Sequence, residues 1–206
     1  MAPESTRPRP MTVNERDTLR RQLRERRRAI PAAERIAAAD ALAQHLLALP
    51  FAPHGGHVAG YWAADGEIAL HRWQLGLPAD VVYCLPVLHG QVLRFAPWRP
   101  GQALTSNRFG IPEPDVDPSQ ALPAEAMALV AMPLVGFDGA GNRLGMGGGW
   151  YDRSFAFRQR EVPPPWLVGV GFAAQRVPSL AAAGWDVPAD AICTERETLL
   201  LQSPSA

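Results

Sequence analysis

The residues best suited to chemistry stand together in one short stretch, Arg143 to Asp152, which reads RLGMGGGWYD. A dense apolar run, 127–137, precedes it, and residues 151–160 can form a helix after it. The order strand, glycine-rich loop, helix presents backbone N–H groups and a helix N-terminus to a phosphate. Arg143 adds a fork of donors for anionic oxygens, and Asp152 stands at the helix start, where it could hold a metal ion. The stretch therefore predicts a nucleotide site.

Four glycines leave room for a ligand in this loop, because they tolerate positive φ and carry no Cβ. They are Gly145, Gly147, Gly148 and Gly149. Trp150 and Tyr151 follow directly, and one of these rings could form a flat wall for a heterocycle while the other is buried. Core packing by either ring, or by both, stays open as an alternative.

A second glycine pattern, residues 169–174, reads GVGFAA and formally matches GxGxxA after a strand. Asp190 even lies about 20 residues on, near the spacing of a ribose-binding acid. However, Pro178 follows closely and no clear helix opens. Gly169 and Gly171 are therefore predicted to allow close packing rather than to bind a dinucleotide.

Three further carboxylates are candidates for the site. Asp186 lies in a loop after the last large strand, where it could face a ligand. Glu67 is expected to open a helix after a strand end, so a simple charge–dipole role is its alternative. Glu113 stands between two prolines, where structural hydrogen bonding is as reasonable as catalysis. Triad hydrolase chemistry has no support, because GxSxG is missing and the five histidines are scattered.

The composition excludes several classes of function. The chain of 206 residues is 47% hydrophobic, and its twenty basic and twenty acidic residues cancel, so no bulk field attracts nucleic acid or anionic lipid. All the basic residues are arginine, which excludes Schiff-base and P-loop lysines. Cys84 and Cys193 stand in apolar runs and are predicted to be buried. With no spanning run and no secretory signal, we expect a cytoplasmic protein that binds neither nucleic acid nor membrane.

The first helix is expected from Asn14 to Pro31, after a disordered proline-rich tail over residues 1–12. It carries most of the basic concentration of the chain: Arg20, Arg21, Arg24, Arg26, Arg27 and Arg28. Most of these are predicted to form a solvated face, with one or two directed at a phosphate. Nucleic-acid binding is a weaker alternative, because no aromatic residues alternate with them.

The rest of the chain alternates between strand and helix patterns. A second helix is expected at 32–49, followed by a helix at 67–75 and one at 151–160; strands are expected at 57–62, 80–88, 91–98, 127–137, 166–172 and 191–194. The segments 80–88 and 91–98 form a hairpin candidate, and 100–120 is a long loop. The prediction is a single α/β domain over 13–202, with a largely parallel sheet flanked by helices on both faces and one β-hairpin.

The ordered set of motifs resembles the 5-formyltetrahydrofolate cyclo-ligase family. The main match is PLVGFDGAGNRLGMGGGWYDRSF, residues 133–155. Weaker matches run in order through nearly all the chain beyond residue 15: the arginine-rich first helix, Trp62 with Glu67, FGIPEP at 109–114, GVGFAAQRVPSL, Asp186 and a closing CTE.

The resemblance implies an ATP- and Mg²⁺-dependent closure of 5-formyltetrahydrofolate to 5,10-methenyltetrahydrofolate, with release of ADP and phosphate through a phosphorylated formyl oxygen. It implies catalytic roles for Arg143 and Asp152 and Mg²⁺ binding by Asp152 and Asp186. The implied ATP contacts are Arg16, Arg20, Arg143, Leu144, Gly145, Met146, Gly147, Gly148, Gly149, Trp150 and Tyr151. The implied folate contacts are Trp62, Glu67, Met146, Gly147, Gly148, Gly149 and Trp150, with Glu67 pairing with the ring N–H donors of the pterin.

Three positions depart from the family's pattern. Arg16 replaces a common lysine, Leu70 replaces a frequent threonine, and Gly148 stands where some members have a basic residue. We expect a small-molecule enzyme that acts as a monomer. The alternatives are another nucleotide- or phosphate-ligand-binding α/β protein without cyclo-ligase activity, and a non-enzymatic RNA-associated module.

Overall fold

The computed structural model describes residues 11–181 and 184–201. The first ten residues of the tail expected over 1–12 lie outside this part. The helices are α1 (Val13–Arg28), α2 (Ala32–Leu47), α3 (His71–Gly76) and α4 (Trp150–Ser154), with 3-10 turns η1 (Ala124–Ala126), η2 (Ala156–Gln159) and η3 (Ala173–Gln175). The strands are β1 (Gly56–Ala59), β2 (Val81–His89), β3 (Val92–Pro97), β4 (Leu104–Ser106), β5 (Pro112–Pro114), β6 (Met127–Pro133), β7 (Gly136–Phe137), β8 (Arg143–Leu144), β9 (Trp166–Val170), β10 (Ala191–Cys193) and β11 (Thr198–Leu200).

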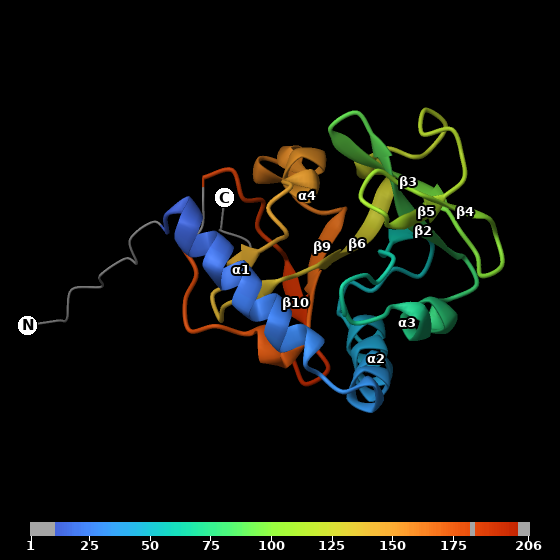
Figure 1. The fold of residues 1–206 in the computed structure, drawn as a ribbon. Coiled ribbons are helices and arrows are strands. Elements are labelled where there is room, and N and C mark those ends of the chain that lie inside the picture. The colour runs from blue at the N-terminus through green and yellow to red at the C-terminus, as the bar shows by residue number, and fades with distance from the viewer. Residues whose placement is uncertain (1–10, 182–183, 202–206) are drawn as a thin grey trace, which may run out of the picture.

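One seven-stranded sheet organises the chain, in the order β11-β10-β9-β6-β1-β2-β3 (Figure 1). The five inner strands, from β10 to β2, pair in parallel. The edge strands β3 and β11 are antiparallel to their neighbours, and β2 with β3 forms the predicted hairpin. The predicted single α/β domain with a largely parallel sheet is therefore confirmed.

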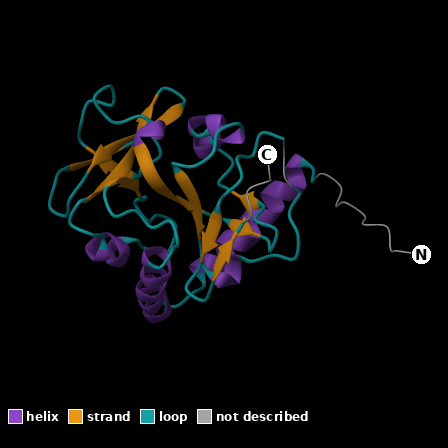
Figure 2. Ribbon diagram, turned by 180° about the vertical axis from the view of Figure 1, so that it is seen from behind, coloured by secondary structure: helices purple, strands orange, loops and turns teal. Residues whose placement is uncertain are grey.

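Both faces of the sheet are covered, which explains why its inner strands are apolar on both sides. Helices α2 and α3 pack on one face, where Leu42 and Trp73 meet Val58 and Leu129. On the other face α4, η1 and η2 cover a second core. That core includes Ala59, Cys84, Phe95, Val130, Met132, Phe155 and Leu167. The sheet runs between these two helical layers (Figure 2). Cys84 and Cys193 are fully buried, as predicted.

Helix α1 begins at a capping box. The Thr12 side chain accepts from the Glu15 N–H at 3.2 Å, and the Glu15 carboxylate accepts from the Thr12 N–H at 2.8 Å. The two side chains thus satisfy N–H groups that would otherwise lack partners at the helix start. Leu23 then anchors the helix in a small apolar cluster with Val135, Leu144 and Leu180.

Replacing Thr12 with alanine is expected to lower the free energy of unfolding by about 1 kcal/mol, the usual contribution of an N-cap side chain. Urea denaturation followed by circular dichroism measures this difference. Thr105→Ala, on the short strand β4, is the control, because Thr105 is exposed and caps no helix. Equal stability of the Thr12→Ala variant and the wild type would contradict the capping role.

The strand expected at 127–137 is divided into two. β6 ends at Pro133, after which the Leu134 N–H bonds to the carbonyl of Val170 and the Val135 N–H to that of Leu144. The chain therefore leaves the main sheet and forms a small antiparallel pair of β7 with β8. This pair holds the start of the glycine loop against the end of the sheet.

The helix expected at 151–160 is also shorter. α4 ends at Ser154, whose hydroxyl donates to the Trp150 carbonyl and accepts from the Leu93 N–H, both at 2.7 Å. This contact fastens the helix end to β3, and a 3-10 turn continues the chain. The loop expected at 100–120 contains the small β4–β5 hairpin, and β11 was not predicted.

The helix expected at 67–75 begins only at His71, so Glu67 does not open it and has no charge–dipole role. Glu67 instead closes a turn, in which its N–H bonds to the Ala64 carbonyl at 2.9 Å. The GVGFAA segment continues β9 into a 3-10 turn, without a helix. A Cβ on Gly169 would lie 2.8 Å from Leu134 Cδ1, which confirms its predicted packing role.

Candidate functional site

A cavity of about 650 Å³ opens at the carboxyl ends of the parallel strands. In the sheet, β2 pairs with β1 on one side, and β6 pairs with β1 on the other side. The strand order therefore reverses between β1 and β6, and α/β sheets bind ligands at the carboxyl ends beside such a point. Residues that follow β1, including Tyr61 and Glu67, line the cavity together with Pro133 at the end of β6.

Nearly every residue proposed for the site from the sequence lines this one cavity. They are Arg16, Arg20, Trp62, Glu67, Arg143, Gly145, Met146, Gly147, Gly148, Gly149, Trp150, Tyr151, Asp152 and Asp186. Leu144 is the exception: it is 1% exposed and packs against Leu23 and Val135. Its side chain stabilises the base of the loop rather than facing the cavity.

The glycine loop adopts a backbone that side chains would oppose. Gly147 has φ of 92° and Gly149 has φ of 64°, and Gly149 is the N-cap of α4. A Cβ on Gly147 would lie 3.3 Å from Arg20 Cζ, and one on Gly149 would lie 2.7 Å from Arg153 Nη1. Two guanidinium groups from outside the loop thus lie against its glycines, so the positive charge absent at Gly148 is supplied by neighbouring elements.

Arg143 and Asp152 form an ion pair across the loop. Arg143 also donates from Nε to the Val187 carbonyl at 3.0 Å, and the Val187 N–H donates to Asp152 Oδ1 at 3.2 Å. The Arg143 side chain is 7% exposed. This closed set of contacts fixes the guanidinium plane and ties the segment after Asp186 to the loop.

Helix α1 provides two more guanidinium groups at this end of the cavity. Arg20 donates from Nε to the Gly145 carbonyl at 2.9 Å and from Nη1 to Asp17 at 2.6 Å. Arg16 Nη2 lies 3.4 Å from Asp186 Oδ2. Because their spacing is i, i+4, Arg16 and Arg20 project from the same face of the helix. Arg20 is thus one of the cluster directed at the cavity, as expected, while Arg21, Arg26 and Arg28 are exposed.

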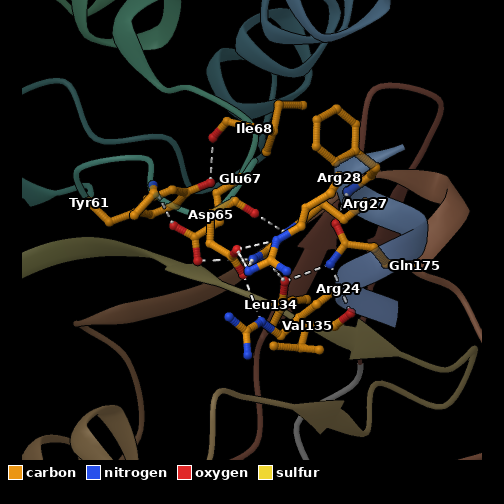
Figure 3. A network of polar contacts seen from close by, with 12 residues as sticks. Arg24, Arg27, Arg28, Tyr61, Asp65, Glu67, Ile68, Leu134, Val135 and Gln175 are labelled. Atoms are coloured by element: carbon orange, nitrogen blue, oxygen red, sulfur yellow. Dashed lines mark hydrogen bonds and ion pairs between the residues drawn. The ribbon is translucent and has the colours of Figure 1, made fainter. Parts of the chain in front are cut away.

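Glu67 also lines the cavity, and its neighbour Arg27 lies about two helical turns along α1 from Arg20, which contacts the glycine loop. Glu67 Oε2 accepts from the Ala64 N–H at 3.0 Å, and its Oε1 lies 3.6 Å from Arg27 Nη1 (Figure 3). Burial raises the pKa of Glu67, while the Ala64 N–H and the Arg27 guanidinium oppose this rise. Trp62 lies nearby on the chain and is 37% exposed, with its ring edge-on to Trp98.

The remaining wall of the cavity is mainly apolar. Phe109 lies edge-on to Trp150, with ring centroids 5.9 Å apart, so the FGIPEP loop reaches the aromatic pair beside the glycine loop. Glu113 accepts hydrogen bonds from the Leu88 N–H and the Asn107 amide, which supports its structural alternative. Trp150 and Tyr151 both line the cavity and both pack against the core, so neither is core alone.

The donor set suits an anionic nucleotide accompanied by a divalent cation. Among residues 11–181 and 184–201, no three His, Cys, Asp or Glu side chains gather to hold a metal ion. Asp152 and Asp186 line the same cavity, each beside an arginine. Because Mg²⁺ is commonly held by one or two carboxylates together with substrate phosphates and water, these two groups fit a cation that arrives with its nucleotide.

Several cavity residues were missed from the sequence. Tyr61 is buried and donates to the Ile68 carbonyl at 2.7 Å, and Trp185 lines the cavity beside Asp186. Arg27, which lies outside the cavity, belongs to the cluster of which most members were predicted to form a solvated face, but it is 1% exposed. Its signal lay in the helical spacing, because Arg16, Arg20, Leu23 and Arg27 fall on one face.

Comparison with known proteins identifies the family of the chain. The sequence model of the 5-formyltetrahydrofolate cyclo-ligase family matches residues 12–195. The chain is 35% identical over 183 residues to the 5-formyltetrahydrofolate cyclo-ligase of Haemophilus influenzae, covering 86% of this chain and 96% of that protein. It is also 35% identical over 178 residues to the enzyme of that name from Escherichia coli, covering 84% and 96%.

Solved structures show the same fold. The 5,10-methenyltetrahydrofolate synthetase of Aquifex aeolicus superposes with a TM-score of 0.77 at 27% identity, covering 93% of this chain and 95% of that one. The synthetase of Mycoplasma pneumoniae gives 0.66 at 21% identity, covering 88% and 99%, and supports the fold alone. On the extent of these matches, the chain belongs to the 5-formyltetrahydrofolate cyclo-ligase family.

Proposed function

We propose that the protein catalyses the ATP- and Mg²⁺-dependent cyclisation of 5-formyltetrahydrofolate to 5,10-methenyltetrahydrofolate, releasing ADP and phosphate. The observation that carries this proposal is the single cavity lined by the glycine loop, three arginines and Glu67. The loop and its arginines suit phosphates, and the Glu67 carboxylate suits a heterocycle with N–H donors. Family membership supports the same reaction.

The chemistry requires activation of a poor leaving group. The formamide oxygen attacks the γ-phosphorus of ATP, and the bond from this phosphorus to the bridging oxygen of ADP breaks. N10 of the folate then attacks the formyl carbon and loses its proton, and the C–O bond breaks so that the oxygen departs as part of the phosphate. Such transfer depends on positioning and on neutralising negative charge more than on a strong base.

The residues of the chain divide these tasks. In this proposal Arg143 and the loop N–H groups orient and neutralise the transferring phosphoryl group, while Arg16 and Arg20 hold the remaining phosphates. Asp152 and Asp186 hold Mg²⁺, which supplies additional positive charge to the phosphate oxygens when bound. The apolar wall excludes water, and Glu67 accepts from the pterin N–H donors.

The first test is the absorbance of methenyltetrahydrofolate after purified protein meets 5-formyltetrahydrofolate, with and without Mg-ATP. ATP-dependent product from the wild type, and little from Asp152→Ala, is the expected result. A folded protein that binds ATP but forms no product would contradict the cyclo-ligase proposal. It would favour a nucleotide- or phosphate-ligand-binding protein without this activity.

An RNA-associated role has little support from the structure. Arg24, Arg27 and Arg28 are directed at Asp65, and Arg20 at Asp17, so several charges of the basic helix are already paired.

Among the described residues, no helix is both long enough and apolar enough to cross a membrane.

Replacing Gly147 with alanine is expected to raise the KM for ATP about tenfold, because a left-handed backbone costs a side chain roughly 1–2 kcal/mol. The new Cβ would also press on Arg20. Gly101→Ala is the matched control: Gly101 has the same φ of 92°, has open space around its Cβ position and does not line the cavity. Steady-state kinetics should show a raised KM for the Gly147 variant alone. Equal ATP affinities in the two variants would refute the cradle role of the loop.

A further inference from the structure

Arg27 is a buried cation that points from α1 to the turn before Glu67 (Figure 3). It donates from Nε to the Asp65 carbonyl at 3.1 Å and from Nη2 to Asp65 Oδ2 at 2.8 Å. Nη1 lies 3.4 Å from the Leu134 carbonyl and 3.6 Å from Glu67 Oε1. Burying an arginine is unfavourable unless its donors are paired, so its partners fix the guanidinium group in one position.

Asp65 is the second member of this arrangement. It has φ of 51°, a left-handed conformation that side chains rarely adopt, and it receives Arg24, Arg27 and Arg28 on its carboxylate. Burial acts to raise the pKa of Asp65, but hydrogen bonds from Arg24 and Arg28 outweigh it and hold the pKa below its usual value. Asp65 therefore stays ionised and holds the turn from which Glu67 projects.

The Glu67 carboxylate is thus held at both oxygens, with the Ala64 N–H at Oε2 and the Arg27 guanidinium beside Oε1. Of the three arginines at Asp65, only Arg27 comes within 4.0 Å of Glu67 among the described residues. Arg28 lies on the outer side of Asp65 and is 54% exposed. Arg27 therefore contacts both Asp65 and Glu67, whereas Arg28 contacts Asp65 alone.

We propose that Arg27 is the positioning residue of the pterin end of the cavity: it orients the Glu67 carboxylate and keeps it ionised, so that it accepts from the ring N–H donors. This inference rests on the proposed function, because it assigns Glu67 to folate recognition. Arg27 itself does not line the cavity and acts only through Glu67.

Five charged or titratable groups face Glu67. Arg24 and Arg27 come from α1, Asp65 from the turn, Tyr61 from the segment after β1 and Tyr151 from α4. Burial raises the pKa of both tyrosines well above the normal range, so they stay neutral at physiological pH. Asp65 acts to raise the pKa of Glu67, and the two arginines act to lower it. Removing Arg27 therefore leaves Glu67 buried beside a like charge, and its pKa must rise.

Three variants isolate this effect. Arg27→Gln removes the positive charge. Arg27→Lys keeps a positive charge but places it on an ammonium group instead of a guanidinium group. Arg28→Gln is the matched control, because it removes a cation that contacts Asp65 and not Glu67. Each is first checked for native circular dichroism at the assay temperature. Where Arg27→Gln does not fold, Arg27→Lys carries the test by its smaller shift, because it keeps a cation beside Asp65 while changing the contact with Glu67.

The direct measurement is the titration of the Glu67 carboxyl by NMR of protein labelled with ¹³C at glutamate Cδ, with Glu67→Gln identifying the resonance. Arg27→Gln is expected to raise the pKa of Glu67 by one unit or more, the size typical of losing an opposite charge within about 4–6 Å. Arg28→Gln should leave it unchanged, and Arg27→Lys should give an intermediate value. This readout needs no catalysis, so a failure of the proposed function does not affect it.

Kinetics provide the second readout. In the wild type, folate affinity should fall at acid pH as Glu67 becomes protonated. In Arg27→Gln this fall should occur about one pH unit higher, matching the raised pKa of Glu67, so in that pH range the KM for the folate substrate should rise about tenfold. Raising the pH should restore folate affinity, and the KM for ATP should change less than about twofold. A merely structural defect would raise both KM values and would not be rescued by pH. An unshifted Glu67 titration in Arg27→Gln, or an equal shift in Arg28→Gln, would overturn the proposal.

Discussion

Replacing Arg143 with glutamine is expected to lower kcat about 10³-fold, the order observed when a fixed donor to a developing phosphoryl or oxyanion charge is removed. The Arg143 guanidinium is 7% exposed and is held by Asp152 and the Val187 carbonyl. In the proposed mechanism it would therefore meet the reacting phosphate without reorganisation, and glutamine supplies neither its charge nor its paired donors. Single-turnover formation of the methenyl product measures the effect without interference from product release.

The loss could also come from leaving Asp152 without its partner, because removing one member of a buried pair destabilises the site. Arg143→Lys separates the two causes, since it keeps a positive charge beside Asp152 while lacking the fork of paired donors. Stability should return in this variant and activity should not. Arg196→Gln is the control for the loss of an arginine, because Arg196 is 79% exposed and lies outside the cavity. Full activity in Arg143→Lys would contradict the predicted role of the guanidinium fork and would leave Arg143 as a charge partner of Asp152.

Replacing Glu67 with glutamine is expected to raise the KM for 5-formyltetrahydrofolate about 10²-fold, since each hydrogen bond to a charged group contributes roughly 1.5–3 kcal/mol. Glutamine keeps the shape of the side chain but presents an NH₂ group where the pterin also presents donors. The two sets of donors then oppose each other in a buried site. Isothermal titration with the folate, and separately with Mg-ATP, measures the two affinities.

The ATP affinity of Glu67→Gln should stay within about twofold of the wild type, because the hydrogen bond and the ion pair of Glu67 are with Ala64 and Arg27 rather than with the glycine loop. Glu125→Gln is the control for the loss of an acidic charge, since Glu125 is exposed on η1. If Glu67→Gln weakened ATP and folate binding equally, Glu67 would be a general structural residue rather than the pterin acceptor.

The glycine loop could be identified from the sequence because its chemistry is contiguous. Arg143, the glycines and Asp152 lie within ten residues, and a strand before them and a helix after them were sufficient to predict a cavity-lining loop. The parallel sheet was also predictable, since its inner strands are apolar on both sides and lie between helices. Local signals of this kind do not depend on distant residues.

The errors arose where distant partners decide the structure. The strand expected at 127–137 divides because the Val135 N–H bonds to the Leu144 carbonyl instead of to the main sheet, and α4 stops where Ser154 binds Leu93 on β3. From the sequence, Arg27 cannot be distinguished from its exposed neighbours, because its partner Asp65 lies 38 positions further along the chain. The helix expected at 67–75 was predicted to begin too early, because residues 64–67 form a turn instead of the first turn of the helix.

The contact between Arg16 and Asp186 has a consequence for biosynthesis. The two residues are 170 positions apart, so one wall of the cavity comes from α1 and another from a segment translated 170 residues later. During synthesis on the ribosome, α1 cannot meet Asp186 or the glycine loop until those segments have emerged. Such long-range contacts carry a large loop-closure entropy and form late. The cavity of a nascent chain therefore stays incomplete until the segment around Asp186 has left the ribosome.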